Sequence, residues 1–184
     1  MDRALVRSYV VLTAALAIVV TSCSDEPGTP TAASTHTTTS ASTGSVAPED
    51  NALADIQPCD LLSAEEAKSL GLDSRGEPDD IAGTASCDWP QSGNGGLIVG
   101  IRPTRGINDL NYDTEKSSEV TIGKYDAVKV EEPNNGKSLC QVLIAVSDSS
   151  SVQVTGSVKA TSTDTAAACE RATKAAELIA DKLP

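Results

Sequence analysis

Few residues in this 184-residue chain have the type and spacing of known catalytic groups. The only histidine, His36, lies in a run of small polar residues, so we expect no Ser-His, Cys-His or His-ligated metal mechanism in a folded domain. The chain also contains no Ser-x-x-Lys sequence, the motif of Ser-Lys catalysis. The sequence therefore predicts that the protein is not an enzyme and needs no cofactor.

Two further patterns resemble ligand motifs and are incomplete. Gly136-Lys137-Ser138 matches the end of a phosphate-binding loop, but Glu131 stands where its first glycine is required. Acidic and amide residues alternate over 109–115 like the start of a calcium loop, but Val120 replaces its closing acid. We interpret the first segment as a hairpin turn and the second as a solvated acidic face.

Aromatic side chains are also few, which limits the ligand pockets that the sequence suggests. Between residues 55 and 184 there are only Trp89, Tyr112 and Tyr125. Within the same range, adjacent carboxylates occur at three places, but neighbours on a chain point in different directions, so no glycosidase pair is indicated. Trp89 has two interpretations, a core anchor packed against Cys87 or the floor of an apolar ligand pocket, and it is the candidate pocket residue.

The N-terminal residues have the pattern of an export signal. Arg3 and Arg7 precede an apolar stretch, residues 9–20, that is too short to span a bilayer permanently. It ends in Val20-Thr21-Ser22-Cys23, which looks like a lipobox; an ordinary cleaved signal peptide is the alternative. We therefore expect residues 1–22 to be a lipoprotein signal peptide, and Cys23 to carry a lipid anchor at the outer face of the cytoplasmic membrane.

The remaining chain divides into a tether and one domain. Residues 27–48 are Pro, Gly, Ser, Thr or Ala at 20 of 22 positions, so we expect residues 23–54 to be a disordered spacer and residues 55–184 to be a single domain. Removing residues 1–22 leaves 12 basic and 25 acidic residues. Such an anionic chain is not expected to bind nucleic acid.

Periodicity predicts an α+β fold for that domain. Ser63-Ala64-Glu65-Glu66 is a capping box that starts a first helix. Residues 139–146 are apolar at nearly every position, so we expect a central strand covered on both faces, within an antiparallel meander over 125–158. A run from 97 to 102 predicts one more strand. After Asp164, small apolar residues recur at helical spacing, which predicts an Ala-rich C-terminal helix packed on the sheet.

Four cysteines remain after Cys23, and in an exported chain they favour two disulfides over a zinc site. Four cysteines allow three pairings, among which the sequence does not choose. We favour Cys59 with Cys87 and Cys140 with Cys169, because each bridge would tie a helix to a strand across loops of similar length. No metal is expected.

The chain resembles a known family at several of these landmarks. They are Pro58-Cys59-Asp60-Leu61-Leu62, Cys87-Asp88-Trp89, Cys140 on an apolar strand, Cys169-Glu170 and the ending Lys182-Leu183-Pro184. Together they resemble the actinobacterial lipoproteins grouped as domain of unknown function 3558. The resemblance implies an envelope location and the four-cysteine framework, and it implies no activity.

These observations favour a lipid-anchored envelope lipoprotein with a non-enzymatic binding or accessory domain outside the cytoplasmic membrane. Its partner would be an unknown envelope protein or a small ligand. The alternative is an extracellular sensory or regulatory domain acting on a membrane protein, for which an anionic surface suits a basic partner. A hydrolase that uses carboxylates alone is the least favoured hypothesis.

Overall fold

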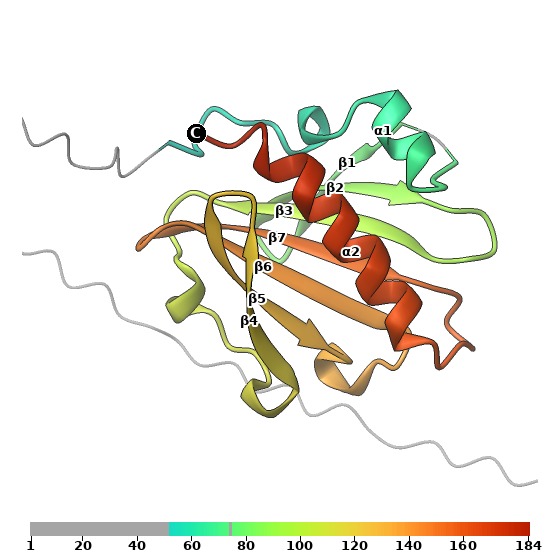
Figure 1. The fold of residues 1–184 in the computed structure, drawn as a ribbon. Helices are drawn as coiled ribbons and strands as arrows, with labels where there is room; N and C mark the ends of the chain where they lie inside the picture. Colours follow the sequence, from blue (N-terminus) through green and yellow to red (C-terminus); the bar gives the residue numbers. More distant parts are fainter. Residues whose placement is uncertain (1–51, 74) are drawn as a thin grey trace, which may run out of the picture. The chain divides into compact units, whose positions relative to one another are not determined.

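The computed structural model describes residues 52–73 and 75–184. The signal peptide, the lipid anchor at Cys23 and the spacer expected before residue 52 lie outside these residues. Seven antiparallel strands form one sheet in the order β1-β2-β3-β7-β6-β5-β4, with helix α2 across one face (Figure 1). The strands are β1 (Glu77–Ile81), β2 (Thr84–Pro90), β3 (Gly96–Arg102), β4 (Ser117–Ile122), β5 (Tyr125–Glu131), β6 (Leu139–Ser147) and β7 (Ser150–Ser157).

The sheet consists of two antiparallel meanders that meet at one seam. Strands β1 to β3 form the first meander, β4 to β7 form the second, and β3 pairs with β7 to join them, with Val99 opposite Val154. The meander expected over 125–158 corresponds to β5, β6 and β7 and is confirmed. Strands β1, β2 and β4 were not anticipated from the sequence.

Both expected helices are present. Helix α1 (Ala64–Ser69) begins at Ser63, whose backbone N–H donates to the Glu66 carboxylate at 2.7 Å while its hydroxyl accepts from the Glu66 N–H at 3.2 Å. This is the expected capping box. Helix α2 (Thr165–Ala180) begins at Asp164, whose carboxylate accepts from the Ala167 N–H at 3.0 Å. Among the described residues, no helix is long and apolar enough to cross a membrane.

Helix α2 packs closely on the sheet because the facing side chains are small. Ala168, Ala172 and Ala176 are fully buried. Gly156 on β7 lies beneath them, where a Cβ would come 2.5 Å from the Ala168 carbonyl oxygen. On α2, alanine gives a flat contact surface, as the Ala-rich pattern predicts.

Two disulfides tie helical segments to this sheet, with the pairing that we favoured. Cys59, in the 3₁₀ helix η1 (Pro58–Leu61), is bonded to Cys87 on β2 with a Cα–Cα distance of 5.1 Å. Cys140 on β6 is bonded to Cys169 on α2 with a Cα–Cα distance of 4.8 Å. The expected fold, an antiparallel sheet with a helix near each end and two disulfides, is confirmed.

Candidate functional site

The candidate site lies on the sheet face opposite α2. Cys140 points toward α2, because it is bonded to Cys169 there, and side chains alternate along a strand. Gln141 and Leu143 of β6 therefore point to the other face. Apolar side chains from residues 107–112 cover part of that face, so β6 is packed on both sides, as expected from its composition. The packed residues are Ile107, Leu110 and Tyr112 against Val128, Val130 and Leu143.

A cleft of about 390 Å³ opens beside this packed patch. Three structural parts build it: the segment before β4, the loop between β5 and β6, and the adjacent strands. We call it the amide cleft, because five of its nine lining residues carry carboxamides, each of which both donates and accepts hydrogen bonds. The lining residues are Asn111, Tyr112, Asp113, Val130, Pro133, Asn134, Asn135, Gln141 and Gln153.

The loop that supplies two of these amides has an unusual backbone. Asn134 and Asn135 have φ values of 54° and 62°, and Glu132 just before them has φ 48°. Asparagine tolerates this left-handed conformation, whereas glutamate adopts it at a cost of order 1–3 kcal/mol. Strained residues of this kind persist only where surrounding contacts hold them, and they concentrate at functional sites.

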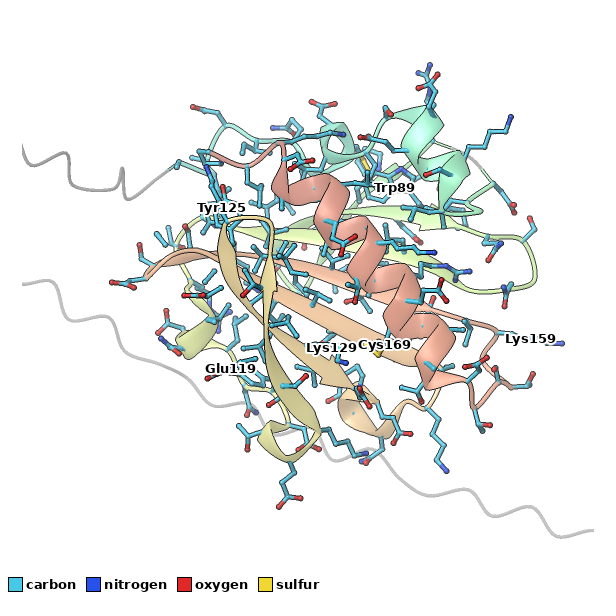
Figure 2. All side chains as sticks on the ribbon, in the orientation of Figure 1. Trp89, Glu119, Tyr125, Lys129, Lys159 and Cys169 are labelled. Atoms are coloured by element: carbon cyan, nitrogen blue, oxygen red, sulfur yellow. A yellow bond between two sulfur atoms is a disulfide. The ribbon has the colours of Figure 1, made fainter. Side chains whose placement is uncertain are left out.

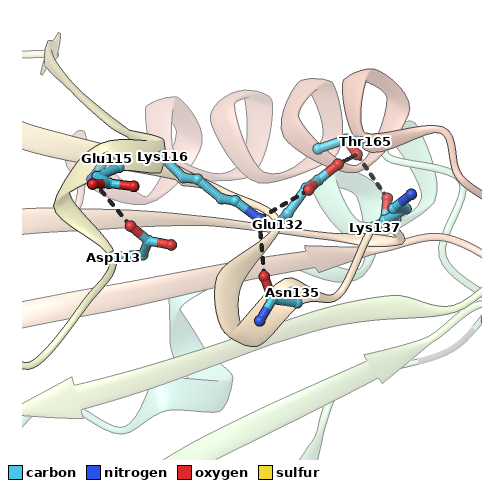
Figure 3. Close-up of polar contacts among 7 residues, drawn as sticks. All are labelled: Asp113, Glu115, Lys116, Glu132, Asn135, Lys137 and Thr165. Carbon is cyan, nitrogen blue, oxygen red and sulfur yellow. Dashed lines mark hydrogen bonds and ion pairs between the residues drawn. The ribbon is translucent and has the colours of Figure 1, made fainter.

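Glu132 is held by contacts on both sides (Figure 3). Lys116 Nζ donates to Glu132 Oε2 at 3.1 Å and to Asn135 Oδ1 at 3.2 Å. On the other side, Thr165 Oγ1, at the start of α2, lies 3.3 Å from Glu132 Oε1 and donates to the Lys137 carbonyl oxygen at 2.7 Å. This network fixes the position of the Asn135 amide at the cleft.

The carboxylates near the cleft serve structural roles. The Lys116 hydrogen bond lowers the pKa of Glu132, so its side chain is ionised at neutral pH. Asp113, in the cleft wall, caps the 3₁₀ helix η3 (Thr114–Lys116) by accepting from the Glu115 N–H at 3.0 Å. Among the alternating acids over 109–115, Asp113 thus lines the cleft and caps η3. Lys137, from the segment that resembles a phosphate loop, lies in the β5–β6 connection, as the hairpin interpretation predicts.

A second hollow, of about 580 Å³, lies between α2 and β5. Figure 2 labels two of its lining residues, Lys129 and Cys169. Lys129 pairs with Glu131 at 3.1 Å, and Lys174 pairs with Glu170 at 2.7 Å. Because these lysines and glutamates at its rim form ion pairs, the hollow presents fewer polar groups that are free to bind a ligand than the amide cleft does.

Trp89, the candidate pocket residue, lies on the opposite face from the amide cleft. Its side chain is 1% exposed and belongs to the main core. A Cβ on Gly76 would overlap both the Trp89 indole and Cys87 Sγ, so the backbone at Gly76 covers them closely. The structure thus places Trp89 as a core anchor, and the pocket hypothesis stays a prediction that requires this backbone to move.

Sequence reasoning did not identify the amide cleft. Asn111, Gln141 and Gln153 are isolated in the sequence, and only the strand register brings the two glutamines onto one face. The hairpin-turn interpretation of Gly136-Lys137-Ser138 assigns no ligand role to Asn134 and Asn135 just before it. The consecutive asparagines, which tolerate a left-handed backbone, were the one local signal.

Comparison with known proteins gives one match. A family model described as "Protein of unknown function (DUF3558)" matches residues 18–182. No curated protein and no solved structure gives a significant match. The family description carries no activity, so function must be argued from the site.

Proposed function

This chain belongs to the DUF3558 family of proteins of unknown function, and we propose that it is a lipid-anchored lipoprotein of the cell envelope whose domain binds a ligand without catalysing a reaction. The resemblance to actinobacterial lipoproteins at the four cysteines supports this proposal. Two disulfides support an oxidising compartment outside the cytoplasm. The lipobox-like Val20-Thr21-Ser22-Cys23 supports the anchor at Cys23.

The binding role rests on the amide cleft. Asn135 Oδ1 already accepts from Lys116, and Gln153 Nε2 donates to Thr155 Oγ1. The remaining donors and acceptors of the five carboxamides complement sugar hydroxyls, which also donate and accept. Tyr112 supplies an aromatic ring for the apolar side of such a ligand. We therefore propose a small, hydroxyl-rich ligand of the saccharide class.

The charge state of Glu132 supports binding over hydrolysis. A general acid near neutral pH needs a raised pKa, and the hydrogen bond from Lys116 lowers the pKa of Glu132 instead. Asp113 is engaged as a helix cap. Neither carboxylate near the cleft therefore has the properties of the proton donor that a carboxylate-based hydrolase requires.

The anchor is tested by replacing the lipidated residue. In the native host, the Cys23→Ser protein should leave the membrane fraction. The wild-type protein should stay in that fraction and have a mass increased by a diacylglycerol. A Cys23→Ser protein that remains bound to membranes would show that something other than this cysteine holds it.

The binding role is tested by titrating the full chain, in detergent micelles, with neutral oligosaccharides. NMR spectra resolve side-chain NH₂ groups, so a ligand of the amide cleft should shift the Gln141 and Gln153 signals. Gln141→Ala should weaken binding at least tenfold, while Gln57→Ala, which removes an exposed amide outside the cleft, should leave it unchanged. Equal effects of the two variants, or no shift with any saccharide, would contradict the proposal.

A regulatory role toward a membrane protein partner is the second candidate. The observation in its favour is the edge strand β4, which is exposed at three of its six residues and contains no proline or lysine. The opposite edge, β1, contains Pro78 and two aspartates. An edge such as β4 can accept a strand from a partner. Photo-crosslinking from Glu119, labelled in Figure 2, should then capture a membrane protein in a salt-sensitive manner.

A further inference from the structure

The polar face that carries the amide cleft continues beyond Gln153 onto the next strand. Gly100 of β3 is the register partner of Gln153 on β7. A Cβ on Gly100 would lie 3.9 Å from Nη1 of Arg102, so the guanidinium of Arg102 lies over this glycine. An arginine therefore lies next to the glutamine at one end of the cleft.

Arg102 lacks a partner within the described chain. Its Nη1 atom is buried and is the one buried side-chain nitrogen or oxygen atom, among residues 52–73 and 75–184, that makes no hydrogen bond. It also forms none of the ion pairs found in these residues. Burial, with a smaller effect of nearby Arg105, lowers its pKa. A desolvated, unpaired N–H of a cation is costly, so a pairing group is expected from elsewhere.

Among the described residues, no carboxylate forms an ion pair with the guanidinium. A Cβ at Gly100 would lie 3.2 Å from both Ser86 Oγ and Thr84 Cγ2, so only glycine leaves room here for the guanidinium. The nearest acid on β2, Asp88, is in register with Ile98, four residues along β3 from Arg102. At about 3.3 Å per residue, that places it roughly 13 Å away along the strand.

We propose that the ligand of the amide cleft carries an oxyanion that pairs with Arg102. This inference rests on the proposed saccharide-binding function and specifies its ligand: a hydroxyl-rich molecule with a carboxylate or a phosphate monoester. Guanidinium binds either group through two parallel hydrogen bonds. The formal net charge of the chain is −12, so anions are repelled in general, and selectivity for this ligand comes from Arg102.

The test compares three matched probes on the full chain in micelles: D-glucose, D-glucuronate and D-glucose 6-phosphate. We expect one of the anionic sugars to bind at least tenfold more tightly than glucose, and the two anions identify which oxyanion is preferred. Arg102→Gln should remove that preference and keep glucose binding. Arg105→Gln, which removes an exposed neighbouring cation, should retain the preference.

The possible failures are distinguishable. Shifts of the cleft amides with equal affinity for all three sugars would refute the charge inference and leave saccharide binding intact. No amide shift with any sugar would refute both. An anion that shifts only the Arg102 Nε–H signal, with the amides unmoved, would also refute the inference, because Arg102 would then act apart from the cleft. Should Arg102→Gln fail to fold, Arg102→Lys keeps the charge without the planar fork and should reduce the preference.

Discussion

Removing the Cys140–Cys169 bridge should cost the domain a large part of its stability. The bridge joins β6 to α2 across a sequence separation of 29 residues. The chain-entropy model for a loop of this length gives about 3.6 kcal/mol at 25 °C. Domains of this size are typically stable by only about 5–15 kcal/mol, so the double variant Cys140→Ala/Cys169→Ala should remain folded with a markedly lower urea midpoint.

The second bridge is a matched control. Cys59 and Cys87 are separated by 28 residues, so the entropic cost of losing their bond is nearly the same. Cys87, however, is fully buried in the main core with Trp89, whereas Cys140 lies in a small separate cluster. Cys59→Ala/Cys87→Ala should therefore be the more destabilising double variant, because it also leaves space in the main core.

Urea titration followed by the fluorescence of Trp89, the only tryptophan, gives the free energy of unfolding of both double variants. Far-UV circular dichroism on the same samples checks that each transition is two-state. A loss below about 1 kcal/mol for the Cys140–Cys169 variant would refute the entropic reasoning. A smaller loss for the Cys59–Cys87 variant than for the other would refute the packing reasoning.

Three further predictions concern the sheet and its helices. Gly156→Ala should destabilise the domain by about 1–3 kcal/mol, measured by urea titration, because its Cβ would come 2.5 Å from the Ala168 carbonyl oxygen and force α2 outward; an unchanged midpoint would contradict this close packing. Burial, then two nearby acids, raises the pKa of Asp88, so the stability this group contributes is present below its unfolded pKa of about 3.9 and is lost as pH rises through the folded value. Asp88→Asn should thus raise the urea midpoint at pH 7 and leave it unchanged at pH 3; a lower midpoint at pH 7 would refute the sign. Lys182→Met should raise the pKa of Glu66, which the Lys182 hydrogen bond lowers, and NMR titration of the Glu66 carboxyl carbon checks this; an unmoved pKa would contradict the assignment.

The parts of the fold with strong periodicity could be predicted from the sequence. Helix α2 repeats small apolar residues at helical spacing, and β6 is apolar throughout. Strand β1 could not be predicted, because Glu77–Ile81 is exposed at every residue and is held by pairing with β2 alone. Tertiary pairing, which no local pattern encodes, makes this segment a strand.

The amide cleft could not be predicted from the sequence for a related reason. Its amides come from the segment before β4, from a loop and from two strands, and each is an unremarkable polar residue in its own context. Arg102 likewise carries no sequence signal, because its isolation depends on which side chains the register places beside it. By contrast, the cysteine pairing favoured from loop lengths was confirmed, and for the Cys140–Cys169 bridge both elements, β6 and α2, could be read from the sequence.

The arrangement of the two disulfides has a consequence for how the chain matures. The loop closed by Cys59 and Cys87 ends before Cys140 begins the next, and each bridge joins a helical segment to a strand of a different meander. When the chain emerges from its N-terminus, Cys59 pairs with the next of these cysteines to appear, Cys87, and Cys140 likewise pairs with Cys169. Oxidation during emergence therefore leads directly to the native bonds without reshuffling. The β3–β7 seam, which neither disulfide crosses, must wait for β7. Because Cys169 emerges after β7, the seam can form before the second disulfide does. The apolar edge of β3 is vulnerable to aggregation until β7 pairs with it.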